Sequence, residues 1–419
     1  MASTYRRHGF LSPFQVRAFR FQFPADMFTS WGTEMEVIVL GWYILVQTNS
    51  VLLLTLYGAL QYLGTLIAPA MGMASDRLGH RNVLTAMRSV YALTALALMT
   101  LSFAGALHPL YVFLLAAMSG LIRASDTGVR NALSADILPS EHLMAGVGLS
   151  RITSDSARIA GALAGAAVYA AIGMAPACSV FAGFYAVGAV FTFLVGSSPS
   201  HHAAAGLAEP RASPAAQLRE GMLQVWNTPP LLAAMWLAFL VNLTAWPWTL
   251  GLLPYVARTE LQAGQTGLGA LAASFSTGAL LGSLTVSLIG RRIQPARFML
   301  VFAMAWHTML LVFVHMPTLT AACAALIAVG ITQSLSMVPM SVMLLHIAGP
   351  RFRGRVMGVR MLAIYGLPVG LLLTGALIPA LGFSQTAVVY CAIGMTATAA
   401  IAWRWRGDLW PAARPANSG

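Results

Sequence analysis

The sequence predicts an all-α integral membrane protein in which twelve transmembrane helices form two six-helix bundles and both termini are cytoplasmic. Two observations predict this fold class. Hydrophobic residues make up 58% of the 419 residues and charged residues only 9%, whereas soluble domains are about 25% charged. The charges are also grouped, and between them lie charge-free runs at residues 37–75, 89–122, 159–208, 221–257, 261–290, 298–350 and 361–403.

Most of these runs are long enough for two membrane crossings, because one helical span needs about 20 residues. Each such run therefore predicts a helical hairpin with an uncharged outer turn. The expected helices lie near residues 21–46, 51–74, 83–105, 109–132, 143–171, 175–196, 228–256, 266–289, 297–315, 319–347, 356–381 and 384–404.

The basic residues predict the orientation. They are all arginines, and they give the chain a net charge of +12. The arginines outside the spans gather at the two termini and in every second connection, and Arg88 is counted with the connection that follows the second helix. Arg258 is the exception, because it lies in one of the intervening connections. This bias places both termini in the cytoplasm and makes the number of spans even. A nucleic-acid partner is not expected, because nucleic-acid binding needs a basic patch or stripe.

The one long polar connection predicts the domain organisation. Residues 198–220 have the composition of a flexible cytoplasmic linker. They divide the chain into an N-terminal bundle, residues 1–197, and a C-terminal bundle, residues 221–419. The stretch 214–226 is expected to form a short amphipathic helix. The sequence has neither a cysteine–histidine metal spacing nor a nucleophile–base cluster, so no metal, cofactor or enzymatic activity is expected.

A charged turn between two apolar runs, residues 72–84, is the most specific motif in the chain. Three further stretches follow it at residues 130–139, 252–282 and 353–358. In the first stretch the defining residues are Gly72, Asp76, Arg77, Gly79 and Arg81. Together, the four stretches resemble the major facilitator superfamily of secondary transporters, and in particular its drug:proton antiporter-3 branch of macrolide-efflux and enterobactin-export proteins.

This resemblance implies a monomeric multi-pass transporter of the bacterial cytoplasmic (inner) membrane. It would export a bulky amphipathic or hydrophobic small molecule by alternating access, in exchange for protons. One departure concerns helix 5, where residues 161–165 lack the proline and second glycine that many antiporters carry. A siderophore or another secondary metabolite is the alternative substrate. A non-transporting membrane sensor is the alternative from another functional class.

Charged residues inside spans are functional candidates, because their burial in the bilayer is costly. The proton-coupling candidates are Glu34, Glu36, Asp126 and Asp155. Glu34 and Glu36 lie about 200° apart around one helix, so only one faces the cavity squarely. Asp26 lies within reach of Arg17 or Arg20. The remaining members of the expected charge network are Arg123, Arg130, Arg151 and Arg158.

Two interpretations of these charges remain open. Low-dielectric surroundings favour a protonated carboxylate, which can then load and release a proton near neutral pH. Alternatively, the charges form fixed salt bridges, for which Arg123, Asp126 and Arg130 share one helix face and Arg151 and Asp155 lie at i and i+4. Glu34 has no partner within its own helix and is the favoured coupling residue.

The C-terminal bundle offers uncharged cavity candidates. With Glu34 and Arg123, the substrate-cavity candidates are Asn242, Trp246, Gln333 and Tyr365. Pro247 kinks the helix between two tryptophans, which would form a flat apolar wall. The alternative is a tryptophan belt at the outer interface, for which Trp248 is the better candidate.

The charged turn is expected to act as a conformational latch. Asp76 would cap the start of helix 11, where the helix dipole favours an anion. Arg77 and Arg81 would reach Asp136, at the end of helix 4. Gly72 and Gly79 would permit close approach and a tight turn.

Overall fold

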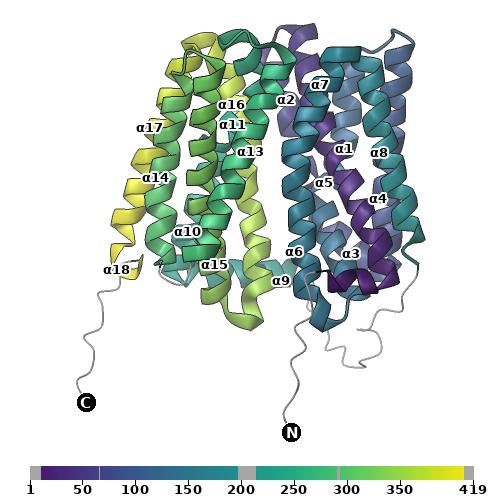
Figure 1. The fold of residues 1–419 in the computed structure, drawn as a ribbon. Helices are drawn as coiled ribbons and strands as arrows, with labels where there is room; N and C mark the ends of the chain where they lie inside the picture. Colours follow the sequence, from purple (N-terminus) through teal and green to yellow (C-terminus); the bar gives the residue numbers. More distant parts are fainter. Residues whose placement is uncertain (1–10, 66, 197–213, 290–292, 410–419) are drawn as a thin grey trace, which may run out of the picture. The chain divides into compact units, whose positions relative to one another are not determined.

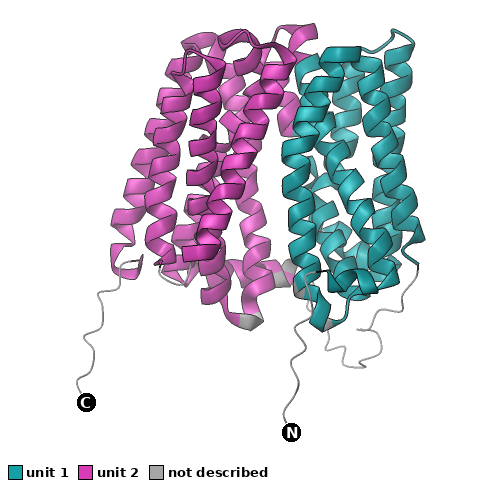
Figure 2. Cartoon of the chain, viewed as in Figure 1, with its two compact units in different colours: residues 1–43, 60–210 teal, residues 44–59, 211–419 magenta. Residues whose placement is uncertain are grey.

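The computed structural model describes residues 11–65, 67–196, 214–289 and 293–409, and these residues form helices joined by short turns (Figure 1). They contain no strand. They group into two compact units, shown in separate colours in Figure 2. Unit 1 comprises Met1–Tyr43 and Leu60–Pro210, and unit 2 comprises Ile44–Ala59 and Arg211–Gly419. Most of the predicted linker, residues 198–213, lies outside the described residues, and the predicted domain boundaries stay a prediction.

Unit 1 is a bundle of long helices. The longest of them, α1, contributes most of its length to this unit and ends in unit 2. The helices of unit 1 are η1 (Ser12–Gln15), α1 (Arg17–Thr48), η2 (Leu63–Thr65), α3 (Ala68–Leu78), α4 (His80–Phe103), α5 (Pro109–Ile137), α6 (Ser140–Ser156), η3 (Ala157–Gly161), α7 (Ala162–Ile172) and α8 (Met174–Leu194).

Unit 2 contains one short surface helix, α9 (Pro214–Trp226), and a second helical bundle. Its other helices are α2 (Val51–Leu60), α10 (Pro229–Thr244), α11 (Trp246–Leu250), α12 (Leu253–Tyr255), η5 (Val256–Glu260), α13 (Gly264–Ile289), α14 (Pro295–Val314), α15 (Leu319–Leu362), η7 (Ala363–Tyr365), α16 (Gly366–Leu381), α17 (Phe383–Arg404) and α18 (Arg406–Leu409).

Eight helices are long and apolar enough to cross a membrane, or nine if the bent pair α2–α3 counts as one span; this count covers the described residues. The eight lie at His80–Phe103, Pro109–Ile137, Met174–Leu194, Gly264–Ile289, Pro295–Val314, Leu319–Gly349, Phe352–Leu381 and Phe383–Arg404. Their lipid-sized apolar stretches identify a multi-pass membrane protein. The predicted number of twelve spans is not reached by this criterion and stays a prediction.

Polar residues and helix breaks explain why the other predicted spans fall short. Helix α1 carries Asp26, Glu34 and Glu36 within its length. The predicted helix at 143–171 is interrupted by the π-turn η3. The predicted helix at 228–256 breaks before Pro247, whose ring removes a backbone donor.

Close packing of small residues joins the π-turn region to α1. A Cβ built on Gly165 would lie 3.0 Å from the Met35 Cα, and one on Gly161 would lie 3.1 Å from the Glu34 Cβ. These distances are shorter than most Cβ contacts in proteins, so a side chain at either position would push the neighbouring helix away by a few tenths of an ångström. Small residues therefore allow the η3–α7 segment to pack closely against α1 at Glu34 and Met35, as is common between membrane spans.

A buried ion pair ties α1 to α4 and α8. Arg88 is fully buried and donates hydrogen bonds to Asp26 and to the Thr192 hydroxyl. Gln22 donates to the same Asp26 oxygen at 2.7 Å. Two expectations are therefore wrong. Arg88 is not a loop arginine, and Asp26 pairs with Arg88 instead of Arg17 or Arg20, because α4 packs against α1 at this level.

We expect Arg88→Ala to lower the free energy of unfolding of the protein by about 3–5 kcal/mol, because it leaves the Asp26 carboxylate buried without its cation. Denaturant unfolding in mixed micelles, followed by tryptophan fluorescence, measures the change. Arg151→Ala is the matched control: this side chain is 66% exposed in its pair with Asp155, and its loss should cost less than about 1 kcal/mol. Equal effects of the two substitutions would contradict the importance of the buried pair.

Candidate functional site

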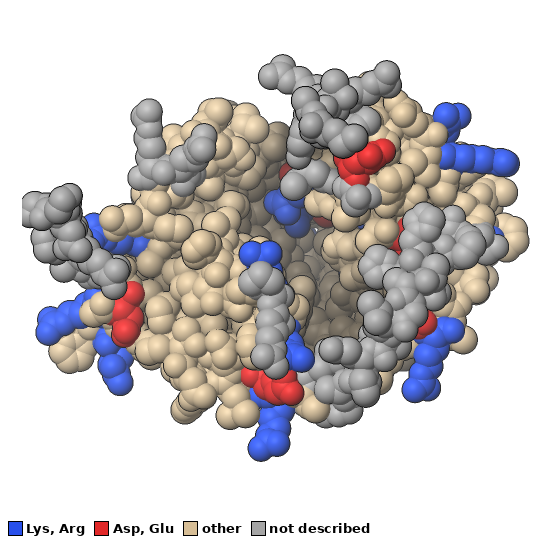
Figure 3. All heavy atoms as spheres, turned by 90° about the horizontal axis from the view of Figure 1, so that it is seen from below, with Lys and Arg blue, Asp and Glu red and all other residues tan. Residues whose placement is uncertain are grey.

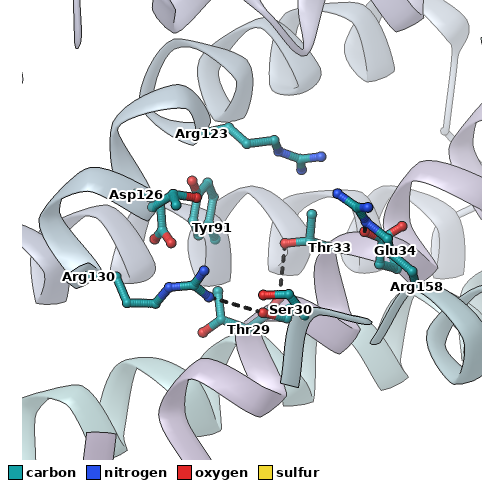
Figure 4. A pocket seen from close by; sticks show the side chains of 11 residues that line it. Thr29, Ser30, Thr33, Glu34, Tyr91, Arg123, Asp126, Arg130 and Arg158 are labelled. Carbon is teal, nitrogen blue, oxygen red and sulfur yellow. Dashed lines mark hydrogen bonds and ion pairs between the residues drawn. The ribbon is translucent and has the colours of Figure 1, made fainter. Parts of the chain in front are cut away.

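A polar pocket of about 170 Å³ lies within unit 1, between α1, α4, α5 and the α6–η3 segment (Figure 4). Three arginines and two acids line it. Its lining residues are Thr29, Ser30, Thr33, Glu34, Tyr91, Arg123, Asp126, Thr127, Arg130, Ser154 and Arg158.

Helical periodicity explains why these residues meet. Residues three and four apart lie on the same helix face. On α5, Arg123, Asp126 and Arg130 follow this spacing, and on the α6–η3 segment Ser154 and Arg158 do so. The polar face of α1 begins at Thr29 and reaches Glu34. These spacings bring the listed polar side chains together at one pocket.

Glu36 is buried beside the pocket and is firmly paired. It accepts a 3.0 Å hydrogen bond from Arg123 and a further hydrogen bond from the Tyr185 hydroxyl. In the salt-bridge interpretation, Asp126 was a candidate partner for Arg123 because it lies on the same face of the same helix. The structure brings Glu36 to Arg123 instead, from α1, so α1, α5 and α8 are joined at this point.

Glu34 lies in the pocket wall and is only loosely paired. Its side chain is 33% exposed, and its Oε1 lies 4.0 Å from the Nε of Arg158, whose side chain is 47% exposed. Figure 4 shows these two side chains together on the wall opposite Asp126. The expectation that only one of Glu34 and Glu36 faces the cavity is consistent with this arrangement: Glu34 lines the pocket and Glu36 is held behind it.

Asp126 and Arg130 share one face of α5 but form no ion pair within the described residues. The Asp126 Oδ2 is buried without a hydrogen-bond partner there. Arg130 makes one long hydrogen bond, 3.4 Å from its Nη1 to the Ser30 hydroxyl. The expected salt bridge between these two residues is therefore absent from the described structure.

Asp155 does not line the pocket. It accepts a 3.2 Å hydrogen bond from the Nε of Arg151, as the i, i+4 spacing predicted. Because Arg151 is exposed, this pair lies at the surface of α6. The structure therefore separates Arg151 and Asp155 from the other members of the predicted charge network.

The charged turn is organised by a histidine that sequence reasoning did not single out. His80 begins α4, with Nδ1 2.6 Å from the Asp136 Oδ2 and Nε2 3.4 Å from the Asp76 Oδ1. It thus links the ends of α3 and α5. Gly79 adopts a φ of 85°, which a glycine accepts without strain.

The predicted arginine contacts of this turn are wrong. Arg81 donates to the Phe193 carbonyl and lies over the Phe193 ring, 5.0 Å from its centroid, and Arg77 is exposed. The structure pairs Asp136 with His80, and not with Arg77 or Arg81. Figure 3 shows arginine side chains in blue and acidic side chains in red, spread over the face of the protein that is seen from below.

The C-terminal candidates lie in unit 2. Trp246 packs edge-to-face on Trp306, with ring centroids 5.3 Å apart. Asn242 donates to the Ala238 carbonyl at 2.8 Å, and a Cβ on Gly366, next to Tyr365, would lie 3.2 Å from the Asn242 Cβ. Gln333 is buried in α15. Whether these residues contact substrate stays a prediction.

The assignment of Trp248 to an outer tryptophan belt is wrong. Its side chain is fully buried and donates to the Thr244 carbonyl at 3.0 Å. It packs against Phe383 and Tyr390. Because the helix breaks before Pro247, the Trp248 ring points into the bundle. A residue of the tryptophan belt would instead lie at the interface between lipid and water.

Several residues of the site carried no usable signal in the sequence. Tyr91 and Tyr185 stack on one another, with centroids 5.4 Å apart, and they line the polar region from α4 and α8. Aromatic residues are common in apolar helices, so their role appears only after the helices pack. His80 could have been singled out from the sequence, because it lies between Arg77 and Arg81 inside the charged motif.

We expect His80→Ala to loosen the turn, because the substitution removes the 2.6 Å contact between the His80 ring and the Asp136 carboxylate at the end of α5. Amide hydrogen exchange of residues 76–83 should become faster. Asn82→Ala is the matched control, because Asn82 bonds only within the turn, to the Leu78 carbonyl at 3.0 Å. Exchange rates that change no more in His80→Ala than in the control would contradict this role.

Solved structures with this fold are transporters. A crystal structure of the nucleoside transporter NupG matches with a TM-score of 0.71 and 13% identity, covering 95% of this chain and 100% of that chain. A bacterial homologue of the iron transporter ferroportin matches with a TM-score of 0.70 and 16% identity, covering 93% and 98%. A bacterial homologue of the human lysosomal transporter Spinster gives 0.72 and 14%, covering 96% and 99%. At these identities the likeness concerns the fold alone.

A search of curated protein sequences gives no match. The family model of the transmembrane secretion effectors, of major facilitator type, matches residues 8–417 and therefore nearly the whole chain. Together with the apolar helices and the transporter fold, this match makes the chain a multi-pass membrane protein that works as a secondary transporter. It belongs to the transmembrane secretion effector family of the major facilitator superfamily.

Proposed function

We propose that this transporter exports a bulky amphipathic or hydrophobic small molecule across the bacterial cytoplasmic membrane, in exchange for protons. In this proposal it is a monomer of the drug:proton antiporter-3 type with twelve spans and cytoplasmic termini. The support is the polar pocket within unit 1, which holds carboxylates among membrane-spanning helices. Such carboxylates are characteristic of proton relays and substrate paths.

Glu34 carries the proposal as the coupling residue. A group that loads and releases protons must reach water and must not be fixed in a strong ion pair. Glu34 is one-third exposed and lies 4.0 Å from its cation. Glu36, by contrast, is held by Arg123 and Tyr185, and Asp155 is paired with Arg151 outside the pocket.

Protonation of Glu34 would weaken its attraction to Arg158 and free that side chain. Arg158 belongs to the π-turn η3, an element that often marks functional segments of helices. A change in the charge of Glu34 would therefore act directly on the α6–η3–α7 segment. This provides a physical route from proton binding to a change in the equilibrium between transporter conformations.

We expect Glu34→Gln to abolish the contribution of a pH gradient to transport, with a loss of at least about tenfold. The amide has nearly the shape of the carboxyl group but does not titrate. Ethidium efflux from proteoliposomes, measured with and without an imposed pH gradient, tests the expectation. The control is Glu141→Gln, an exposed acid outside the pocket. A variant that keeps the full gradient dependence would exclude Glu34 as the coupling residue.

The charged turn is proposed to act as a conformational latch. Asp76 lies beside His80, at 3.4 Å, in the motif that joins α3 to α4. Asp76→Asn should reduce flux by about tenfold or more while the protein remains folded and inserted. Flux in proteoliposomes and elution as a single species in size-exclusion chromatography measure the two properties. Normal flux in this variant would rule out the latch.

A second substrate class is supported by the three arginines of the pocket wall. Arg123, Arg130 and Arg158 suit an anionic compound, such as a siderophore or another secondary metabolite. Release of a catecholate siderophore from loaded vesicles would distinguish this class from cationic drugs. Ligand binding without any flux would instead indicate a membrane sensor.

A further inference from the structure

We propose that the unit 1 pocket binds a zwitterionic head group of the exported molecule, with its ammonium on Asp126 and Tyr91 and its anionic group on Arg130. This inference rests on the proposed export function and specifies the chemical class of its substrate. It assigns Asp126 and Arg130 to the substrate, and it leaves Glu34 to the proton.

The first observation is a pair of opposite charges on α5 that are buried but not joined. Asp126 is 9% exposed and Arg130 is 8% exposed. They lie at i and i+4, where an ion pair normally forms. Neither takes part in an ion pair among the described residues, and the Asp126 Oδ2 and the Arg130 Nε have no hydrogen-bond partner there.

The neighbouring charges do not satisfy this pair. Arg123 is paired with Glu36, Arg158 faces Glu34, and Asp26 is paired with Arg88. In the described part of the pocket, therefore, the Asp126 carboxylate and the Arg130 guanidinium form no ion pair, although Arg130 also attracts the Asp26 carboxylate at longer range. Buried charges of this kind are costly unless a partner of opposite charge is supplied.

The second observation is an unpartnered hydroxyl next to the carboxylate. Tyr91 is almost fully buried, and its hydroxyl makes no hydrogen bond within the described residues. It lines the same pocket as Asp126, and Figure 4 shows the two side chains adjacent. A carboxylate and a hydroxyl oxygen side by side are acceptors suited to the N–H groups of a primary ammonium.

The anionic end has its own donors. The Arg130 guanidinium extends toward Ser30 and Thr29 on α1, as Figure 4 shows, and its bond to the Ser30 hydroxyl is long, at 3.4 Å. A guanidinium and two hydroxyls together suit a carboxylate or phosphate. The pocket volume of about 170 Å³ is large enough for a small head group.

The test compares three probes that share one alkyl chain: 2-aminooctanoic acid, octylamine and octanoic acid. Binding to the full-length protein in lipid nanodiscs is measured by calorimetry at pH 7.4 without any gradient, and the signal of empty nanodiscs is subtracted. The zwitterion should bind about tenfold or more tightly than either singly charged probe, since each charged hydrogen bond contributes about that factor. Equal affinities for all three probes would overturn the proposal.

Two substitutions give a crossed pattern that a folding defect cannot produce. Asp126→Asn should reduce the affinity for the zwitterion to that of octanoic acid and leave octanoic acid binding unchanged. Arg130→Gln should reduce it to that of octylamine and leave octylamine binding unchanged. The controls are Glu141→Gln and Arg219→Gln, which remove exposed charges. Unchanged zwitterion binding in Asp126→Asn would also overturn the proposal.

The outcomes separate this inference from the proposed function. Gradient-driven efflux that depends on Glu34, combined with no preference for the zwitterion, would disprove the head-group assignment alone. The crossed binding pattern combined with no flux in proteoliposomes would support the assignment and disprove export.

Discussion

Two buried ion pairs between helices hold the bundle of unit 1 together. Charges inside membrane-spanning helices are costly unless they pair with one another or face a polar cavity. Asp26 and Arg88 bring α1 against α4, and Glu36 and Arg123 bring α1 against α5. Helix α1 is thereby held at two levels by fixed ion pairs. The pocket lies on the polar face of the same helix.

This arrangement separates structural charges from available ones. The pairs Asp26–Arg88 and Glu36–Arg123 have carboxylates that are at most 5% exposed, and they are reinforced by Gln22, Thr192 and Tyr185. Glu34 and Arg158 are looser and reach the pocket. The salt-bridge interpretation therefore describes the first group, whereas proton loading at Glu34 remains a proposal.

Local features of the fold were predictable from the sequence, and the pairing of its charges was not. The amphipathic segment at 214–226 forms α9 with those bounds, because a proline start and a helical apolar period are both local signals. Gly349, with a φ of 65°, divides α15 between the two predicted helices at 319–347 and 356–381. Partner choice, however, depends on how neighbouring helices rotate against one another. Spacing alone favoured Asp126 for Arg123, whereas tertiary packing supplies Glu36. Trp248 was misplaced for the same reason, because the chain turns at the break before Pro247.

The π-turn η3 has a consequence for how Arg158 can move. A π-turn holds one more residue than an α-turn, and one residue corresponds to about 100° of rotation around a helix. Migration of this extra residue along the segment would therefore swing the guanidinium around the helix axis while both ends of the segment stay in place. Such a local change of winding would move the Arg158 guanidinium relative to the pocket without displacing the contact between Gly165 and Met35 that anchors α7 to α1.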